Sequence, residues 1–280
     1  MITLYMLDFI KYIQGFASPA LDHFLTIFNL FSQQYFLVLL VAVVYWTIDK
    51  RKGEQLSFAL IFTTCISCGI KGVFKVSRPY NYEGIRVLNK HTAPGYSFPS
   101  ADSSAASSVA STFSLWTRKP YLWVLLGIYV LVIGFSRMYF GLHFPTDVAG
   151  GIIIGAVIAY GINKILSVVK DTLKLYTVAG LLLLLFVFFG QEPDYYKTMG
   201  LMLGAVCGIM IEHKFVNFTC NIPRSRKALR LIIGICSVIA IAVISKFLFP
   251  EGNLFYLIEK FLLTFFAVGI YPFIFTRLKF

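Results

Sequence analysis

Residues 175–190 read LYTVAGLLLLLFVFFG, a run of sixteen residues without a charge. A helix that crosses a bilayer needs roughly 20 mostly apolar residues, so a run of this length with its flanks approaches a full span. A strand of a membrane barrel alternates apolar and polar residues over about 10 positions, and this run does not alternate. Because lipid offers no partners to the backbone, the run predicts a transmembrane helix.

Similar apolar segments recur along the 280 residues. They cover residues 35–48, 55–74, 103–117, 121–136, 146–166, 197–212, 230–248 and 256–276. The mean hydropathy is +0.77 and only 14% of residues are charged, against about 25% in soluble proteins. These values exclude a soluble domain and predict an all-α, polytopic transmembrane helical bundle that resides in the cell membrane.

Residues 1–34 differ from these segments because Asp8, Lys11 and Asp22 lie among many aromatic residues and Pro19 interrupts the pattern. We interpret them as amphipathic or interfacial helices, with a tilted span as the alternative. The chain then divides into an N-terminal part (1–34), a core (35–170) and additional C-terminal transmembrane helices (171–280).

The lysines and arginines predict the orientation, because cytoplasmic loops carry an excess of them. One set of alternate loops, which includes Lys50–Lys52 and Arg118–Lys119, holds fifteen of the 25. The other set holds ten, together with nine of the thirteen acids, and is predicted to be extracytoplasmic. The net charge of +12 is therefore a topology signal and an attraction to anionic lipid, and we predict no nucleic-acid partner.

The five cysteines do not form a disulfide framework. Cys65 and Cys68 have the spacing of a redox or zinc motif, but they lie within an apolar span without further ligands. We interpret all five as structural.

Three polar stretches fall on the predicted extracytoplasmic side, namely KGVFKVSRP (71–79), PSAD (99–102) and SRMYFGLHFPTD (136–147). Lysine and arginine at span ends commonly extend to the interface, and serine or aspartate after proline commonly caps a helix. Here, however, cations, a histidine and carboxylates converge at the ends of consecutive spans. Lys71 and Arg78 are seven residues apart, which places both on one side of a helix. The convergence indicates a site for an anion.

These stretches resemble the three-part signature of the type-2 phosphatidic acid phosphatases, also called lipid phosphate phosphatases. The signature is Lys-x6-Arg-Pro, then Pro-Ser-Gly-His, then Ser-Arg-x5-His-x3-Asp. The first part is met by Lys71, Arg78 and Pro79, and the third by Ser136, Arg137, His143 and Asp147. The resemblance covers about residues 35–166 and implies a six-helix lipid phosphatase core, to which the C-terminal helices are added.

The matched residues have a coherent chemistry. Lys71, Arg78 and Arg137 are suited to neutralising a phosphate and its transferring phosphoryl group. Ser100 and the backbone at Ala101 add hydrogen bonds at the start of a helix, where the dipole favours an anion.

His143 is placed to attack phosphorus and form a phospho-histidine. Asp147, four residues on, is placed to hold the other ring nitrogen, and Pro145 between them predicts that a helix starts at the pair. One histidine with scattered carboxylates is a poor ligand set, so we predict no metal and no cofactor.

The middle part departs from the signature after Pro99 and Ser100, because Ala101 replaces glycine and Asp102 replaces histidine. In the family that histidine is the general acid that protonates the leaving alcohol. We leave three interpretations of Asp102 open: it is a protonated acid, or the substrate is a diphosphate that needs little acid help, or the site binds phosphate lipids without turnover. His91, in the loop before this motif, is interpreted as a solvated loop residue in preference to an alternative proton donor.

The resemblance therefore implies an enzyme that hydrolyses a lipid phosphate or a polyprenyl diphosphate, such as undecaprenyl diphosphate, at the extracytoplasmic face. The expected partner is a bilayer lipid that carries the phosphate or diphosphate. Two other hypotheses stay open. One is a phosphotransferase that passes the phosphoryl group to a second lipid, and the other is a catalytically impaired protein that binds or transports phospholipid.

Overall fold

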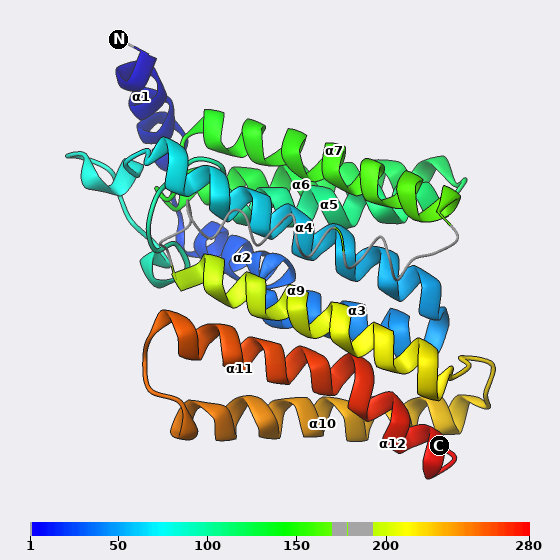
Figure 1. Ribbon diagram of the computed structural model, residues 1–280. Coiled ribbons are helices and arrows are strands. Elements are labelled where there is room, and N and C mark those ends of the chain that lie inside the picture. The colour runs from blue at the N-terminus through cyan, green and yellow to red at the C-terminus, as the bar shows by residue number, and fades with distance from the viewer. Residues whose placement is uncertain (1, 170–177, 179–192) are drawn as a thin grey trace. The chain divides into compact units, whose positions relative to one another are not determined.

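In a computed structural model, residues 2–169, 178 and 193–280 are described, and every regular element among them is helical (Figure 1). The long helices before the undescribed segment are α1 (Ile2–Gln14), α2 (Pro19–Asn29), α3 (Gln34–Val43), α4 (Lys50–Phe74), α5 (Ala101–Trp116), α6 (Pro120–Tyr139) and α7 (Pro145–Val168). Those after it are α9 (Pro193–Ile211), α10 (Arg224–Leu248), α11 (Asn253–Phe265) and α12 (Tyr271–Arg277). The all-α prediction is confirmed.

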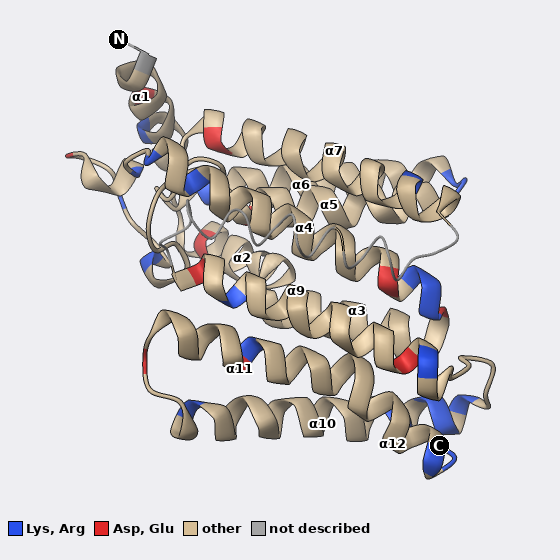
Figure 2. Cartoon of the chain, viewed as in Figure 1, with Lys and Arg blue, Asp and Glu red and all other residues tan. Residues whose placement is uncertain are grey.

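Six described helices are long and apolar enough to cross a membrane, and a bent pair adds a possible seventh span. The six cover Lys50–Asn81, Pro120–Tyr139, Pro145–Val168, Pro193–Val216, Arg224–Leu248 and Asn253–Arg277. The bent pair joins Pro19–Ser32 to Gln34–Ile48 at an angle of 49°. Figure 2 shows long uncharged stretches between charges that gather near the helix ends, as a bilayer requires.

Two of the predicted transmembrane segments are not among the candidate spans of the structure. The segment predicted at 103–117 corresponds to α5 (Ala101–Trp116), but at 16 residues this helix is shorter than the candidate spans. The run at 175–190 lies outside the described residues apart from Val178, so its prediction stays untested. The division into 1–34, 35–170 and 171–280 also stays a prediction.

The chain folds as two compact units, each of which contains part of α3 and part of α4. The first unit comprises residues 1–37 and 66–161, and the second comprises residues 38–65 and 162–280. All residues of the predicted phosphate site belong to the first unit.

Within the first unit, α5 and α7 pack backbone to backbone because their facing residues are small. A Cβ at Gly155 of α7 would lie 2.1 Å from the carbonyl oxygen of Ser104, and one at Gly151 would lie 2.6 Å from that of Ser100. Small residues allow such close approach of membrane helices. The contact fixes the start of α5 against the start of α7, where the predicted site residues lie.

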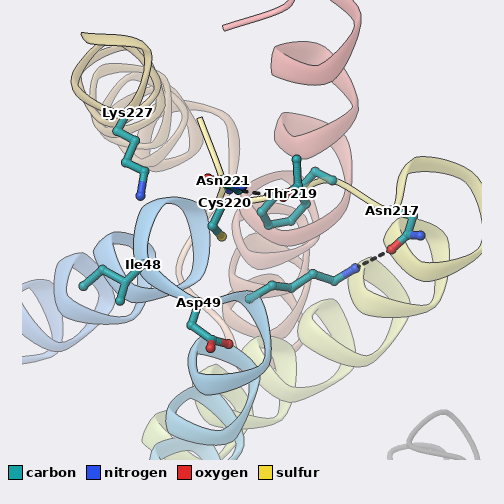
Figure 3. Close-up of a pocket in the computed structure, with 9 residues that line it drawn as sticks. Ile48, Asp49, Asn217, Thr219, Cys220, Asn221 and Lys227 are labelled. Carbon is teal, nitrogen blue, oxygen red and sulfur yellow. Dashed lines mark hydrogen bonds between the residues drawn. The ribbon is translucent and has the colours of Figure 1, made fainter. Parts of the chain in front are cut away.

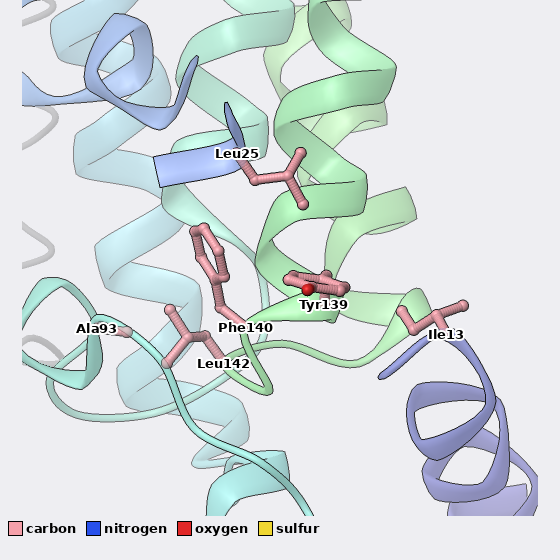
Figure 4. Close-up of a cluster of buried hydrophobic side chains, with 6 residues drawn as sticks. All are labelled: Ile13, Leu25, Ala93, Tyr139, Phe140 and Leu142. Carbon is pink, nitrogen blue, oxygen red and sulfur yellow. The ribbon is translucent and has the colours of Figure 1, made fainter. Parts of the chain in front are cut away.

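The N-terminal helices pack on the segment that joins α6 to α7. Ile13 of α1 and Leu25 of α2 belong to one buried cluster with Tyr139, Phe140 and Leu142 (Figure 4). Ala93 of the loop before α5 completes the cluster. The segment that carries His143 is thus held by apolar contacts with residues of 1–34.

Within the second unit, α9 and α11 are also closely packed. Gly200 and Gly204 of α9 face the α11 backbone, where a Cβ would approach carbonyl oxygens of Leu257 and Phe261 within 2.5 Å. A separate aromatic core forms around Trp46, Tyr271 and Phe275. All five cysteines lie among the described residues, and none of them forms a disulfide.

Candidate functional site

The predicted site residues lie at helix ends within the first unit. Lys71 is in the last turn of α4, which ends at Phe74, and Arg78 lies beyond that end in extended backbone, so the prediction that the two share one side of a helix is wrong. Ser100 caps the start of α5. Arg137 is in the last turn of α6, while Asp147 is in the first turn of α7, which begins at Pro145. We call Lys71, Arg78, Asp102, Arg137, His143 and Asp147 the histidine cluster.

Arg78 and His143 are in direct contact at the centre of the cluster. The Nη1 atom of Arg78 lies 3.0 Å from Nε2 of His143 and 3.0 Å from the carbonyl oxygen of Leu142. Because a guanidinium only donates, Nε2 must accept, and the ring proton of a neutral imidazole then lies on Nδ1. Nε2 thus carries the lone pair that a nucleophile needs.

The other ring nitrogen of His143, Nδ1, points toward Asp147, and the hydroxyl of Ser97 lies close to both. Nδ1 of His143 is 3.6 Å from Oδ2 of Asp147, which is too long for a hydrogen bond. The Ser97 hydroxyl donates to the same Oδ2 and lies 3.5 Å from Nδ1. Asp147 also accepts from the backbone N–H of Phe144 at 2.7 Å, so its carboxylate is fixed before it meets the imidazole.

The environment of His143 keeps its imidazole neutral. The side chain is 2% exposed, and burial is the main cause that lowers its pKa well below the usual value. The positive charges of Arg78, Lys71 and Arg137 lower that pKa further. A buried, uncharged imidazole beside three cations is the form that attacks phosphorus.

Lys71 and Arg78 also hold the loop that leads into α5. Nζ of Lys71 donates to the carbonyl oxygens of Tyr96 and Ser97 at 2.7 and 3.3 Å. Arg78 donates through Nε to Gly95 at 2.9 Å and through Nη2 to Pro94 at 2.7 Å. The two cations therefore position residues 94–97 and keep positive charge next to His143.

Ser100 and Ala101 form the start of α5, as the sequence predicts. The Ser100 hydroxyl accepts from N and Oγ of Ser103, and the Ser100 amide donates to the carbonyl oxygen of Asp147 at 3.0 Å. The cap of α5 is Ser100, and Asp102 is the second residue of the helix. Its carboxylate instead pairs with Nη2 of Arg137 at 3.0 Å.

Three polar residues that the sequence did not single out contact the cluster. They are Ser97, Thr92 and Asn29, the last of which belongs to α2. Asn29 is buried and ends α2, a helix that is rich in phenylalanine. A single amide in such an apolar stretch is a feature of the sequence from which a buried polar contact could have been predicted. Nothing in the spacing distinguishes Ser97. His91, by contrast, is exposed on its loop, in keeping with a solvated residue.

A second ionic cluster lies within the second unit and consists of Glu54, Glu212, His213 and Lys50, which we call the carboxylate cluster. The ligand atoms of Glu54, Glu212 and His213 lie within 4.8 Å of one another, a spacing at which a metal ion could be held. However, Lys50 already forms an ion pair with Glu212, and His213 is 2.7 Å from Glu54. The lysine thus supplies the cation there.

A pocket of about 550 Å³ opens beside this cluster, lined in part by Lys50, Asn217 and Lys227 (Figure 3). Lys50 reaches across it to Oδ1 of Asn217 at 3.4 Å. Asp49 also lines it, so the lining is of mixed charge. None of the residues predicted for the phosphate site lines this pocket.

The long apolar helices are those of a multi-pass integral membrane protein, and the histidine cluster gathers three cations around a buried imidazole. The sequence profile of the PAP2 superfamily matches residues 54–170, and that of its transmembrane extension, "PAP2 superfamily phosphatase, transmembrane extension", matches residues 196–280. The crystal structure of Aquifex aeolicus LpxE superposes with a TM-score of 0.52 and 30% identity, over 56% of this chain and 94% of that one. The chain belongs to the PAP2 superfamily.

Two curated relatives carry different names. The chain is 32% identical to the putative undecaprenyl-diphosphatase YbjG of Escherichia coli, over 43% of this chain and 62% of that protein. It is 24% identical to human sphingosine-1-phosphate phosphatase 2, over 66% of this chain and 50% of the relative. The chain thus spans about half to three fifths of the length of these relatives.

A phosphatidylglycerolphosphate phosphatase from Bacillus subtilis has the same fold, with a TM-score of 0.51 and 21% identity, over 61% of this chain and 88% of that one. At this identity the likeness concerns the fold alone.

Proposed function

We propose that this protein is a membrane lipid phosphatase that hydrolyses the terminal phosphate of a lipid diphosphate through a phospho-histidine at His143. The observation that carries the proposal is the arrangement around the imidazole, in which Arg78 faces Nε2 while Ser97 and Asp147 lie on the side of Nδ1. Membership of the PAP2 superfamily supports a phosphate ester or anhydride as the substrate class.

The reaction follows from these contacts. The terminal phosphate draws the Arg78 guanidinium onto its oxygens, which frees the lone pair of Nε2. That nitrogen attacks phosphorus, the bond to the bridging oxygen breaks, and the lipid monophosphate leaves. Water then attacks the phospho-histidine and releases inorganic phosphate. Lys71 and Arg78 stabilise the charge that spreads over the phosphoryl oxygens in each step.

Asp102 favours a diphosphate over a monophosphate. Its carboxylate accepts from Arg137 in an ion pair, so it is bound as an acceptor and is not a proton donor. An alkoxide that leaves from a monoester requires a proton, and general acid catalysis contributes about 10²–10⁴ in rate. A leaving lipid phosphate is itself a weak base and departs without that proton.

The site is proposed to face the extracytoplasmic side. Along α4, Lys50, Arg51 and Lys52 lie at one end and Lys71 lies at the other. Helix α6 begins directly after Arg118 and Lys119 and ends at the site with Arg137. Basic residues mark the cytoplasmic ends of spans, so both helices support a site at the opposite end.

The test offers the purified protein four lipids and measures phosphate release. The panel contains a polyprenyl diphosphate, a polyprenyl monophosphate, phosphatidic acid and phosphatidylglycerol phosphate. We expect release from the diphosphate far above that from the three monoesters. Equal rates on all four would contradict the leaving-group argument.

A matched variant sharpens the same test. Asp102→His supplies a proton donor, so its activity on the monoesters is expected to rise relative to that on the diphosphate, while Asp102→Asn controls for loss of the carboxylate. Release from none of the four lipids by the natural sequence, together with activity in Asp102→His, would identify an impaired, lipid-binding protein instead.

A further inference from the structure

The Arg137 side chain is buried in a cage that uses almost all of its donors. Nη1 donates to Oδ1 of Asn29 and to Oγ1 of Thr92, both at 3.2 Å. Nη2 pairs with Asp102 at 3.0 Å and lies 3.5 Å from the carbonyl oxygen of Thr92. Four of the five N–H bonds of the guanidinium are thereby directed to acceptors of this chain.

The fifth donor differs from these. Nε of Arg137 has no hydrogen-bond partner within the described residues, although the side chain is only 1% exposed. A buried donor without a partner costs free energy, and in native proteins the large majority of buried polar side-chain atoms have a hydrogen-bond partner. An Nε–H kept in this state near the positive charge of Arg78 and the neutral imidazole of His143 is suited to an anion oxygen.

Asn29 connects this cage to the N-terminal helices. Its Oδ1 accepts from Arg137, and its Nδ2 donates to Oγ of Ser136 at 2.6 Å. Ser32, one turn further on, contacts both Oδ1 of Asn29 and Oδ1 of Asp102, at 3.3 and 3.4 Å. The end of α2 therefore fixes the guanidinium of Arg137 and the carboxylate that opposes it.

We infer that Asn29 is a positioning residue of the phosphate site. Asn29 and Asp102 together orient the guanidinium of Arg137, so that its Nε–H is the donor presented to the phosphate. This inference rests on the proposed function for the identity of the anion. It also assigns a role to residues 1–34, which then form part of the enzyme and are more than a membrane anchor. In this role Asp102 orients Arg137 and takes no part in proton transfer.

The experiment measures binding of inorganic pyrophosphate to the purified, full-length protein by calorimetry, alongside turnover of a polyprenyl diphosphate. Asn29→Ala is expected to weaken pyrophosphate binding about tenfold, the size of one lost hydrogen bond to a charged group, and to raise KM more than it lowers kcat. The control is Thr26→Ala, which removes an exposed hydrogen bond of the same helix, to Asn89, and should change neither quantity.

A double-mutant cycle separates positioning from a general loss of structure. If Asn29 acts through Arg137, then Asn29→Ala has no further effect on pyrophosphate affinity in an Arg137→Ala background. Equal losses in both backgrounds would overturn the inference, and so would an unchanged affinity in Asn29→Ala. If Asn29→Ala does not fold, Thr92→Val removes the other acceptor of Nη1 and is expected to act in the same direction.

The two proposals fail in different ways. A protein that binds pyrophosphate but releases phosphate from no lipid refutes the proposed function, and the Asn29 comparison still decides the inference. A protein that hydrolyses the lipid normally with Asn29→Ala, at unchanged KM, refutes the inference alone.

Discussion

The histidine cluster and the carboxylate cluster are both groups of charged side chains at helix ends, but they differ in net charge. With a neutral imidazole, the histidine cluster has three cations against two carboxylates, and Nε of Arg137 has no hydrogen-bond partner among the described residues. The carboxylate cluster has two carboxylates, and its net charge is at most zero even when His213 is protonated. An excess of positive charge with a free donor indicates an anion site, whereas a balanced cluster is consistent with a structural role.

The largest expected effect distinguishes the nucleophile from its neighbours. His143→Gln removes the attacking lone pair, and loss of a nucleophile costs about 10⁶-fold in kcat in comparable systems. Phosphate release from a polyprenyl diphosphate measures it, with the exposed His91→Gln as the matched control. A His143→Gln protein with more than a tenth of the natural activity would remove the nucleophile assignment.

Arg78 is expected to have the next largest effect. Arg78→Gln removes a donor aimed at the developing phosphoryl charge, and the loss of one such donor costs about 10²–10³ in kcat. Lys75→Gln removes an exposed cation from the same stretch and is expected to leave kcat unchanged. Similar losses in both variants would mean that general positive charge matters and that the contact with His143 does not.

Ser97 is expected to contribute about tenfold. Ser97→Ala removes the hydroxyl between Nδ1 of His143 and Asp147, and a hydrogen bond in such a place is worth about a factor of ten. The exposed Ser77→Ala provides the control for kcat on the diphosphate. An unaltered kcat in Ser97→Ala would show that Asp147 orients the imidazole without the serine.

The pH dependence tests the charge of the histidine cluster. Burial and the three cations lower the pKa of His143, so the neutral nucleophile persists below pH 6.5 and is lost only as the pH falls through the lowered pKa. We therefore expect the acidic limb of kcat/KM to lie below pH 6.5. Arg78→Gln removes one of the cations, so the limb should move to higher pH; a shift to lower pH would contradict this electrostatic account.

The carboxylate cluster is expected to affect stability and not catalysis. Lys50→Met leaves Glu212 buried without its cation, and breaking a buried pair in this way costs about 3–5 kcal/mol. The melting temperature should fall, while kcat of the folded protein stays unchanged. Lys50→Met/Glu212→Gln should recover stability, and the exposed Lys214→Met is the control. Lost activity in a stable Lys50→Met protein would break the contrast between the two clusters.

The sequence predicted the helical membrane fold well because its long apolar runs lack the alternation of barrel strands, and the helix is then the regular structure that pairs the backbone within lipid. It was less informative at the N-terminus, where residues 19–32 and 34–48 form a pair of helices bent by 49°. Composition there described the polarity of residues 1–34 but not their contact with Arg137.

The candidate site shows the same limit. Lys71, Arg78, His143 and Asp147 could be singled out because their spacing places them at consecutive span ends. The partners Ser97, Thr92 and Asn29 could not, because each reaches the cluster through the path of a loop or the packing of a helix. The pairing of Asp102 with Arg137 depends likewise on the relative rotation of α5 and α6, which no spacing in the sequence specifies.

The most direct test of the account is a search for the covalent intermediate. The protein is mixed with a polyprenyl diphosphate that carries ³²P in its terminal phosphate, quenched in alkali within the first turnover, and digested for peptide mapping. The account predicts a base-stable, acid-labile phosphoryl group on His143, absent from His143→Gln. Turnover of the labelled lipid with no label on His143 at any time would contradict it.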